Sequence, residues 1–251
     1  MEEDKFRIIA ENISKKFKRD FKKRDGILGK LLGFLDKGPY ACFYALNDVS
    51  FNGKAGEVIG IIGRNASGKS TLLRILAGIY KPNNGNVKIN GRTVYLGSFN
   101  PGLKTKLTMR ENIYLTGSIM GLSQSDIKRK FDEIVDFSGL KDYVDARLYQ
   151  FSTGMITRLN FSIMLFCVKH QNPDILLLDE IFSAGGDAEF REKAIKKMEE
   201  LIKGGATVVL VSHDLAILEK YCDRLILLDN GKVIREGKPR EVIEEYMDSI
   251  K

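Results

Sequence analysis

The chain has 251 residues, of which 43% are hydrophobic and 29% charged, and it contains three cysteines and five prolines. This composition excludes a wholly disordered chain and provides enough apolar material for one large domain, with or without a subdomain. Few and scattered cysteines argue against a disulfide framework and favour a reducing compartment. The N-terminus lacks the pattern of a signal peptide, and the longest apolar run, from Leu159 to Val168, is shorter than the ~20 residues that cross a bilayer. We therefore expect no membrane span.

The net charge of +7 is concentrated in one short segment. From Lys15 to Lys30 there are eight Lys or Arg against two Asp, so this stretch carries +6 of the total. Two hypotheses remain open for the basic insertion at about residues 15–40. It is either a solvated loop or a contact for anionic headgroups or an acidic partner near a membrane, where each clustered basic residue gains about 1 kcal/mol. A nucleic-acid binder usually spreads its basic side chains over a face, so nucleic acid is a less favoured partner.

The first part of the chain predicts mostly strands. In order, the pattern predicts an edge strand over residues 6–14, the basic insertion, a strand over 45–51, a buried strand over 57–62, a helix over 69–77 and two short strands on either side of residues 90 and 91. Helical periodicity follows over about residues 105–170, with Ser123 beginning one helix and Gly139 interrupting the run. This region is predicted to be a helical subdomain inserted into the core.

The last part of the chain predicts strands alternating with helices. The strands are expected over residues 175–178, 207–211, 225–228 and 232–235, and the helices over 187–202, 215–221 and 239–250. Buried strands that alternate with helices imply a mostly parallel sheet covered on both faces. We therefore expect an α/β fold in a single domain of residues 1–251.

The clearest motif lies between the predicted strand 57–62 and the helix that follows it. It fits the phosphate-binding pattern G-x-x-x-x-G-K-[ST] and consists of Gly63, Arg64, Asn65, Ala66, Ser67, Gly68, Lys69 and Ser70, followed by Thr71. Its glycines let successive backbone N–H groups point at phosphate oxygens, and the helix adds its positive end at the same place. Lys69 is expected to reach the β- and γ-phosphates, and Ser70 to ligate Mg²⁺.

Two further strands are predicted to end in polar residues at the same edge of the sheet. Asp179 and Glu180 follow the strand 175–178, and His213 follows the strand 207–211. Ligands of an open parallel sheet bind beyond the carboxyl ends of its strands. Asp179 suits the Mg²⁺ ion, Glu180 can polarise the water that attacks a γ-phosphate, and His213 can hydrogen-bond that phosphate.

In this order and setting, the three motifs resemble those of an ATP-binding cassette (ABC) ATPase. The family also has a signature sequence, commonly LSGGQ, before the acidic strand, and residues Tyr149 to Met155 occupy that place. Ser152 and Gly154 keep the residue types of the signature, whereas Thr153 and Met155 depart from it. The resemblance implies a P-loop NTPase core with an antiparallel β subdomain and the helical subdomain.

The resemblance also implies ligands and partners. It implies ATP and Mg²⁺, and a head-to-tail homodimer in which Ser152, Thr153 and Gly154 of one chain face the phosphate loop of the other. It implies a separate integral membrane permease, so that the chain would lie on the cytoplasmic face of the cell membrane as a peripheral protein.

Several segments look like the polysaccharide-exporter branch of the family, whose members energise export of lipid-linked O-antigen, capsule or teichoic acid. These segments are residues 44–51, 96–101, 110–115 and 121–123, together with the Gly-Met end of the signature. The resemblance covers nearly the whole chain, from about Phe6 to Tyr246. Some O-antigen members carry an additional C-terminal carbohydrate-binding domain, and we expect none here because the chain ends soon after its last predicted strand.

Three departures from the family pattern affect the site. Most members carry a glutamine before the helical subdomain, but residues 95–108 contain none, and Ser98 and Asn100 are the candidates to replace it. The loop after Glu180 is one residue longer than usual, which leaves the function of Asp187 open. Either Phe17 or Tyr44 is expected to stack on adenine.

Two alternatives to a transport ATPase are considered. A clamp acting on nucleic acid or the ribosome is supported only by the basic cluster, and it lacks the expected long coiled coil and tandem cassette; a neighbouring permease gene would argue against it. A degenerate regulatory module would explain the altered signature, but Glu180 and His213 are retained. Release of phosphate that disappears with Lys69→Ala would exclude the degenerate module.

Overall fold

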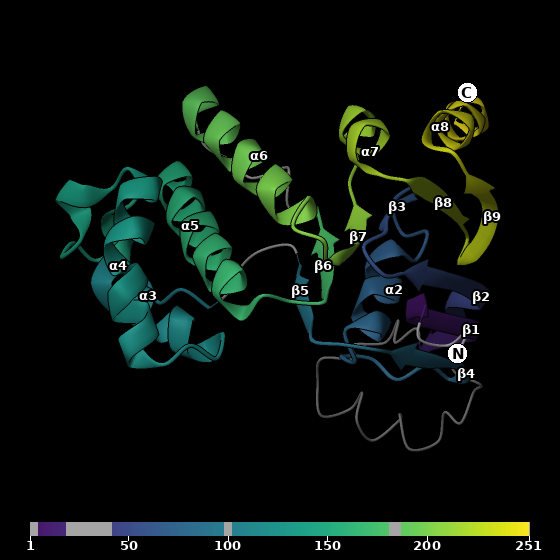
Figure 1. Ribbon diagram of the computed structural model, residues 1–251, viewed down its shortest axis with the longest axis horizontal. Helices are drawn as coiled ribbons and strands as arrows, with labels where there is room; N and C mark the ends of the chain where they lie inside the picture. The colour runs from purple at the N-terminus through teal and green to yellow at the C-terminus, as the bar shows by residue number, and fades with distance from the viewer. Residues whose placement is uncertain (1–4, 19–41, 98–101, 181–186, 251) are drawn as a thin grey trace, which may run out of the picture.

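The computed structural model describes residues 5–18, 42–97, 102–180 and 187–250. Its main sheet has six strands in the order β5 (Thr93–Leu96), β6 (Ile175–Asp179), β7 (Thr207–Val211), β3 (Val58–Ile62), β8 (Arg224–Asp229) and β9 (Lys232–Gly237). All neighbouring strands in this sheet are parallel except β8 and β9, which meet at a tight turn. The predicted mostly parallel α/β core is therefore confirmed (Figure 1).

A second sheet is antiparallel and has the order β2 (Cys42–Lys54), β1 (Phe6–Lys18) and β4 (Asn84–Ile89). The prediction of an edge strand at the N-terminus is wrong, because β1 is the middle strand and pairs with β2 on one side and β4 on the other. Ile8 of β1 pairs with Ile89 of β4, which comes 81 residues later in the chain, so the local sequence pattern does not reveal this pairing. The strand also continues to Lys18, beyond the predicted end at residue 14, and the basic stretch thus begins inside a strand.

The two predicted strands beside residues 90 and 91 are present but lie in different sheets. β4 completes the antiparallel sheet, whereas β5 joins the edge of the main sheet next to β6. Asp174 stabilises the connection from β4 to β5, because its carboxylate accepts a hydrogen bond from the backbone N–H of Arg92 at 2.8 Å. The chain therefore passes from one sheet to the other within a few residues, and β5 ends beside the acidic end of β6.

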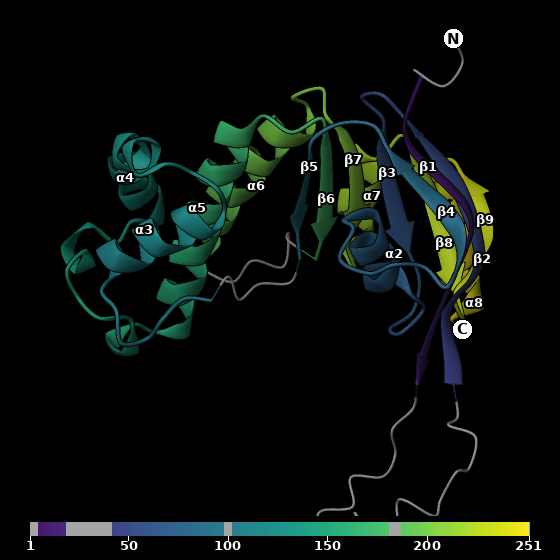
Figure 2. The same cartoon turned by 90° about the horizontal axis from the view of Figure 1, so that it is seen from below.

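Both faces of the main sheet are covered, as predicted. Helix α2 (Lys69–Leu76) and the antiparallel sheet pack on one face, where Ile59 and Ile61 of β3 are buried (Figure 2). Helices α5 (Thr153–Gln171), α6 (Ala188–Ile202), α7 (Leu215–Tyr221) and α8 (Pro239–Ser249) contribute to the core on the other face, with Val58 and Ile62. Successive side chains of a strand point to opposite faces, so a strand buried on both sides reads as a continuous apolar run.

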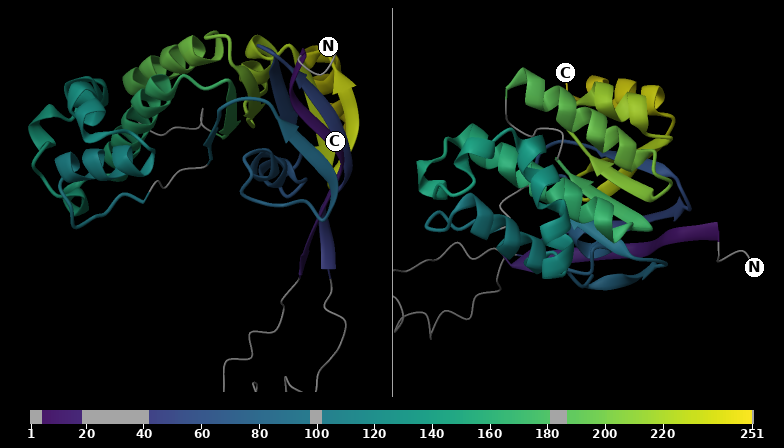
Figure 3. Two further views of the ribbon diagram at one scale, coloured as in Figure 1. Left: turned by 60° about the horizontal axis from the view of Figure 1, so that its bottom comes forward. Right: turned by 60° about the vertical axis from the view of Figure 1, so that its left-hand side comes forward.

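The helical subdomain consists of α3 (Met109–Ile119), α4 (Gln124–Ser138) and most of α5, with short 3₁₀ turns at Lys141–Tyr143 and Leu148–Gln150. It has a core of its own, and α5 also packs against the main sheet. Ser123 caps α4 by accepting the N–H of Asp126, and Gly139 ends that helix with φ +64°, as the sequence predicts. Figure 3 shows the subdomain at the end of the molecule opposite the antiparallel sheet. Within the described part of the chain, every helix is too short or too polar to cross a membrane.

Candidate functional site

The phosphate loop joins the end of β3 to the start of α2, and two of its positions leave no space for a side chain. A Cβ atom at Gly63 would lie 2.1 Å from the carbonyl oxygen of Leu228, and one at Gly68 would lie 2.5 Å from that of Ala45. Both residues also have positive φ angles, +154° and +111°, which side chains disfavour. The backbones of the neighbouring strands therefore lie so close to the loop that only glycine fits at positions 63 and 68.

Lys69 is the first residue of α2, and its ammonium group lies inside this bend. Its Nζ donates hydrogen bonds to the carbonyl oxygens of Gly63 at 2.6 Å and Arg64 at 2.9 Å, and the residue is only 7% exposed. Burial lowers the pKa of Lys69, while the nearby carboxylates of Glu180 and Asp179 act in the opposite direction. The loop thus holds a buried positive charge at the start of a helix.

Asp179 ends β6 and faces the phosphate loop with a carboxylate whose two oxygens have different partners. Ser70 of α2 donates its hydroxyl to Oδ1 at 3.2 Å, and Tyr95 of β5 donates to Oδ2 at 3.3 Å. The side chain is almost fully buried, at 1% exposure. A buried carboxylate is tolerated only where it is hydrogen-bonded or paired, so these contacts are part of what keeps Asp179 in place.

Glu180 and His213 form a pair beside Asp179, as the shared sheet edge predicts. His213 Nε2 lies 3.2 Å from Oε1 of Glu180, and the backbone N–H of Glu180 donates to the carbonyl of Val211 at 3.0 Å. Burial raises the pKa of Glu180, against the lowering effect of His213. The backbone of Glu180 has φ +57°, a left-handed conformation that is unfavourable for glutamate and is typical of functional positions.

One cavity of about 320 Å³ is lined by Lys69, Ser70, Glu180 and His213, and it also has aromatic side chains in its wall. Its lining includes most of the phosphate loop, Glu180 and His213, with Phe17 and Phe43 from the ends of β1 and β2. The two rings lie 6.0 Å apart. Tyr44 is not among the described lining residues, and Lys16 lies over its ring at 4.5 Å. The sequence does not predict Phe43 as a site residue, because it becomes a neighbour of Phe17 only through the pairing of β1 with β2.

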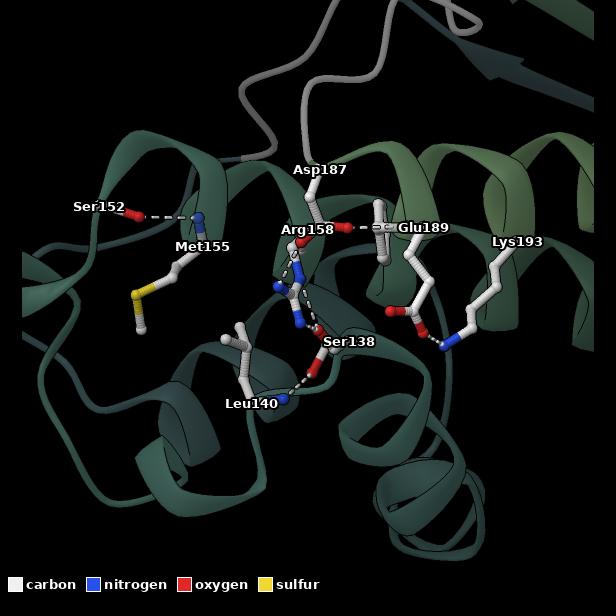
Figure 4. A network of polar contacts seen from close by, with 9 residues as sticks. Ser138, Leu140, Ser152, Met155, Arg158, Asp187, Glu189 and Lys193 are labelled. Atoms are coloured by element: carbon white, nitrogen blue, oxygen red, sulfur yellow. Dashed lines mark hydrogen bonds and ion pairs between the residues drawn. The ribbon is translucent and has the colours of Figure 1, made fainter.

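The signature residues lie in another part of the molecule. Ser152 is the N-cap of α5 and accepts the backbone N–H of Met155 at 3.2 Å, while Thr153 and Gly154 form the first turn of that helix (Figure 4). The described lining of the cavity contains none of these residues. The structure of one chain therefore brings the phosphate loop, Asp179, Glu180 and His213 together but leaves the signature apart from them.

Arg158, six residues after Ser152 on α5, connects the signature helix to α4 and α6 (Figure 4). Its Nε and Nη2 donate to the carbonyl oxygen of Ser138 at 2.8 and 2.6 Å, and its Nη1 donates to Asp187 Oδ2 at 3.1 Å. Asp187 caps α6 by accepting the N–H of Phe190 at 2.8 Å, and the hydrogen bond with that N–H lowers the pKa of Asp187. The structure thus gives Asp187, whose function the sequence left open, a capping position and a partner on α5.

Some predicted positions fall outside the described residues. Ser98 and Asn100, the candidates to replace the glutamine, lie in residues 98–101, and the long loop after Glu180 lies in residues 181–186. Tyr95 is the additional polar residue that the structure brings to the site from the same part of the chain. An isolated tyrosine in a strand carries no sequence signal for such a contact.

Comparison with known proteins agrees with this arrangement. A family model described as "ABC transporter" matches residues 46–183. An O-antigen export system ATP-binding protein, RfbB of Klebsiella pneumoniae, is 35% identical over 208 residues, covering 83% of this chain and 82% of its own. A teichoic acids export ATP-binding protein, TagH of Lactococcus lactis subsp. lactis, is 40% identical over 247 residues, or 98% of this chain. The chain spans only about half of that relative, 52% of its length.

A solved structure shares the fold over nearly the whole chain. The dimeric post-hydrolysis state of the ATP-binding cassette MJ0796, bound to ADP and Pi, superposes with a TM-score of 0.68 at 25% identity. The match covers 93% of this chain and 99% of the other. The architecture described above is therefore that of an ATP-binding cassette.

Proposed function

Because this chain belongs to the ABC transporter family, we propose that it is an ATP-hydrolysing subunit that powers the export of a lipid-linked polymer through a separate membrane permease. The observation that carries the proposal is the convergence of Lys69, Glu180 and His213 on one cavity at the carboxyl ends of the parallel strands. Asp179 lies behind the cavity wall and is hydrogen-bonded to Ser70, which lines it. In this cavity a helix start and a lysine supply positive charge, while a paired glutamate supplies a base.

The cavity fits a nucleoside triphosphate. The bend at Gly63 and Gly68 lets backbone N–H groups approach phosphate oxygens, since a side chain at either position would collide with the backbone. Lys69 reaches the β- and γ-phosphates by giving up its hydrogen bonds to the loop carbonyls. Phe17 and Phe43 line the cavity and offer aromatic faces for adenine, which favours Phe17 over Tyr44 as the stacking residue.

The site also fits a magnesium ion. Ser70 and Asp179 provide hard oxygen donors 3.2 Å apart, and Mg²⁺ is usually bound by one or two protein oxygens together with substrate phosphates and water. The described residues hold no cluster of three or more His, Cys, Asp or Glu side chains that would bind a metal by themselves, which agrees with a site completed by phosphate. When bound, the ion neutralises charge on the β- and γ-phosphates.

Hydrolysis then depends on positioning by Glu180 and His213. Glu180 accepts a proton from the attacking water, and a raised pKa makes its carboxylate a stronger base than an exposed glutamate. His213 lies beside Oε1, where it orients the carboxylate and can turn to donate to the γ-phosphate. The strained backbone of Glu180 directs its side chain, and such strain costs of order 1–3 kcal/mol.

The distance between the signature and the cavity within one chain supports a homodimer. In a head-to-tail pair, Ser152 and Gly154 at the start of α5 would face the γ-phosphate bound by the other copy, and the positive end of that long helix favours an anion there. The triphosphate would then join the two chains, and its hydrolysis would loosen them. This cycle would move a permease to which each chain docks on the inner face of the membrane.

The polymer class rests on the relatives. TagH aligns with 98% of this chain and RfbB with 83%, so the alignment to the teichoic acid exporter includes a part of the chain that the alignment to the O-antigen exporter leaves out. This difference favours a lipid-linked teichoic acid as the exported polymer over an O-antigen.

Replacement of the proposed base tests the assignment. Glu180→Gln keeps the shape and the cavity but removes the base, so we expect unchanged ATP affinity, turnover reduced by roughly 10²–10⁴-fold, and an ATP-bound dimer detectable by light scattering. Glu189→Gln, at an exposed position of α6 paired with Lys193, is the matched control and should hydrolyse ATP normally. Wild-type turnover in Glu180→Gln would contradict the proposal.

A further inference from the structure

Tyr95 links the strand β5 to the carboxylate that we assign to the metal. It pairs in register with Leu177 of β6, two residues before Asp179, and its hydroxyl donates to Asp179 Oδ2 at 3.3 Å. Ser70 donates to the other oxygen, Oδ1, at 3.2 Å. The two oxygens are thus held from opposite sides, one by α2 and one by β5.

The hydrogen bond from Tyr95 to Asp179 is made in a buried place, so its loss would be costly. Asp179 is 1% exposed, so water cannot replace a lost hydrogen-bond partner at low cost. The contact from Tyr95 is longer than the 2.7–2.8 Å that is typical of O–H···O bonds, and such bonds at catalytic sites commonly shorten when the ligand arrives. Once Ser70 turns its oxygen toward a cation, Tyr95 is the remaining described side chain that fixes the rotation of this carboxylate.

The position of the tyrosine ring is itself built into the strand. A Cβ atom at Gly97 would lie 2.4 Å from the hydroxyl oxygen of Tyr95 and 2.6 Å from the ring carbon that bears it. The absence of a side chain at Gly97 therefore lets the ring lie against the end of β5 and reach Asp179. On α2, Arg74 contacts Tyr95 and Tyr80, and its hydrogen bond with Tyr95 raises the pKa of Arg74.

Tyr95 also stays a hydrogen-bond donor. Burial and the neighbouring Asp179 both raise the pKa of Tyr95, although Arg74 acts in the opposite direction. Positioning of Asp179 by Tyr95 rests on the contact between the Tyr95 hydroxyl and Asp179 Oδ2 at 3.3 Å and involves no change of protonation.

Resting on the function proposed above, we propose that Tyr95 is a positioning residue for the divalent cation. Its hydroxyl holds Oδ2 of Asp179 so that Oδ1 faces Ser70 and the cation, and Gly97 provides the space for this contact. Tyr95 lies on β5, which precedes in sequence the segment where most family members carry a glutamine, and it contacts the carboxylate of Asp179 directly.

The test measures metal binding rather than turnover. Purified full-length chains are titrated with Mn²⁺ by electron paramagnetic resonance in the presence of AMP-PNP, and the affinity for AMP-PNP alone is measured in EDTA. Tyr95→Phe should weaken Mn²⁺ binding by about tenfold, the loss typical of groups that orient metal ligands, and should leave metal-free AMP-PNP affinity within about twofold. Gly97→Ala, which displaces the ring, should weaken Mn²⁺ binding in the same way.

Tyr143→Phe is the matched control, because Tyr143 lies on an exposed 3₁₀ turn of the helical subdomain, and its Mn²⁺ affinity should equal that of the wild type. Tyr95→Phe with Mn²⁺ affinity within twofold of the wild type would overturn the inference, whether or not its melting temperature changes. If wild-type protein binds AMP-PNP no better with Mn²⁺ than without it, the proposed function fails and this inference with it. If the wild type and Tyr95→Phe both bind Mn²⁺ with the same affinity in the presence of AMP-PNP, the proposed function stands and only the assignment of Tyr95 fails.

Discussion

Removal of the Arg158 guanidinium should destabilise the molecule more than its surface position suggests. The group donates twice to the carbonyl of Ser138, a fully buried residue at the end of α4, and lies 5.6 Å from the ring centre of Phe190. Arg158→Met keeps most of the apolar stem and removes these interactions. The change isolates the polar network because the methionine still fills the space between α4 and α6.

The expected magnitude follows from the separate contacts. An orphaned buried carbonyl costs about 1–3 kcal/mol, the cation–π contact is worth about 0.5–1 kcal/mol, and an exposed ion pair adds about 0.2–1 kcal/mol. The pair with Asp187 belongs to the last class, since the two side chains are 23% and 59% exposed. The total is about 3 kcal/mol, which for a chain of this size lowers Tm by roughly 6–12 °C.

Two further variants separate the contributions. Asp187→Asn keeps the cap of α6, because asparagine caps as well as aspartate, and loses only the ion pair, so it should lower Tm by less than about 4 °C. Arg158→Lys keeps the charge but cannot donate twice in the same geometry, and it should fall between the other two. Thermal unfolding followed by circular dichroism measures all three. Equal losses in Arg158→Met and Asp187→Asn would refute the assignment of most of the energy to the Ser138 carbonyl.

Two other predictions concern titrating groups. In native protein at pH 8, iodoacetamide should modify the exposed Cys42 but not Cys167 or Cys222. Burial raises the pKa of the Cys167 and Cys222 thiols to about 12, so neither forms the reactive thiolate at this pH. Equal labelling of all three cysteines in peptide mass spectrometry would contradict this prediction. Burial alone would raise the pKa of Glu57, but hydrogen bonds from Arg224 and a backbone N–H outweigh it, and the pKa falls below its ordinary 4.5. Because this pKa is lowered, ionised Glu57 stabilises the fold above pH 4.5, and that stabilisation is lost as the pH falls. Glu57→Gln should therefore lose roughly 1–3 kcal/mol of unfolding free energy at pH 7, measured by urea unfolding, and less below pH 4.5. A loss that does not change with pH would contradict this prediction.

The sequence by itself determined the parts of the site that are local in the chain. The phosphate loop needs a strand, two glycines and a helix start in direct succession, and all of these follow from adjacent residues. Asp179, Glu180 and His213 were placed at one sheet edge by a single rule about parallel strands, which the structure bears out in their geometry. Their chemical functions remain proposals.

Only the tertiary structure decided which distant residues meet. The N-terminal strand lies in the middle of the antiparallel sheet because β4 pairs with it over sequence separations of 70 to 81 residues. Phe43 lies beside Phe17 because β1 and β2 pair across the basic segment. The contact of Tyr95 with Asp179 depends in the same way on β5 lying beside β6. Hydrophobic periodicity records which face of an element is buried, but the identity of the neighbour depends on how whole elements pack.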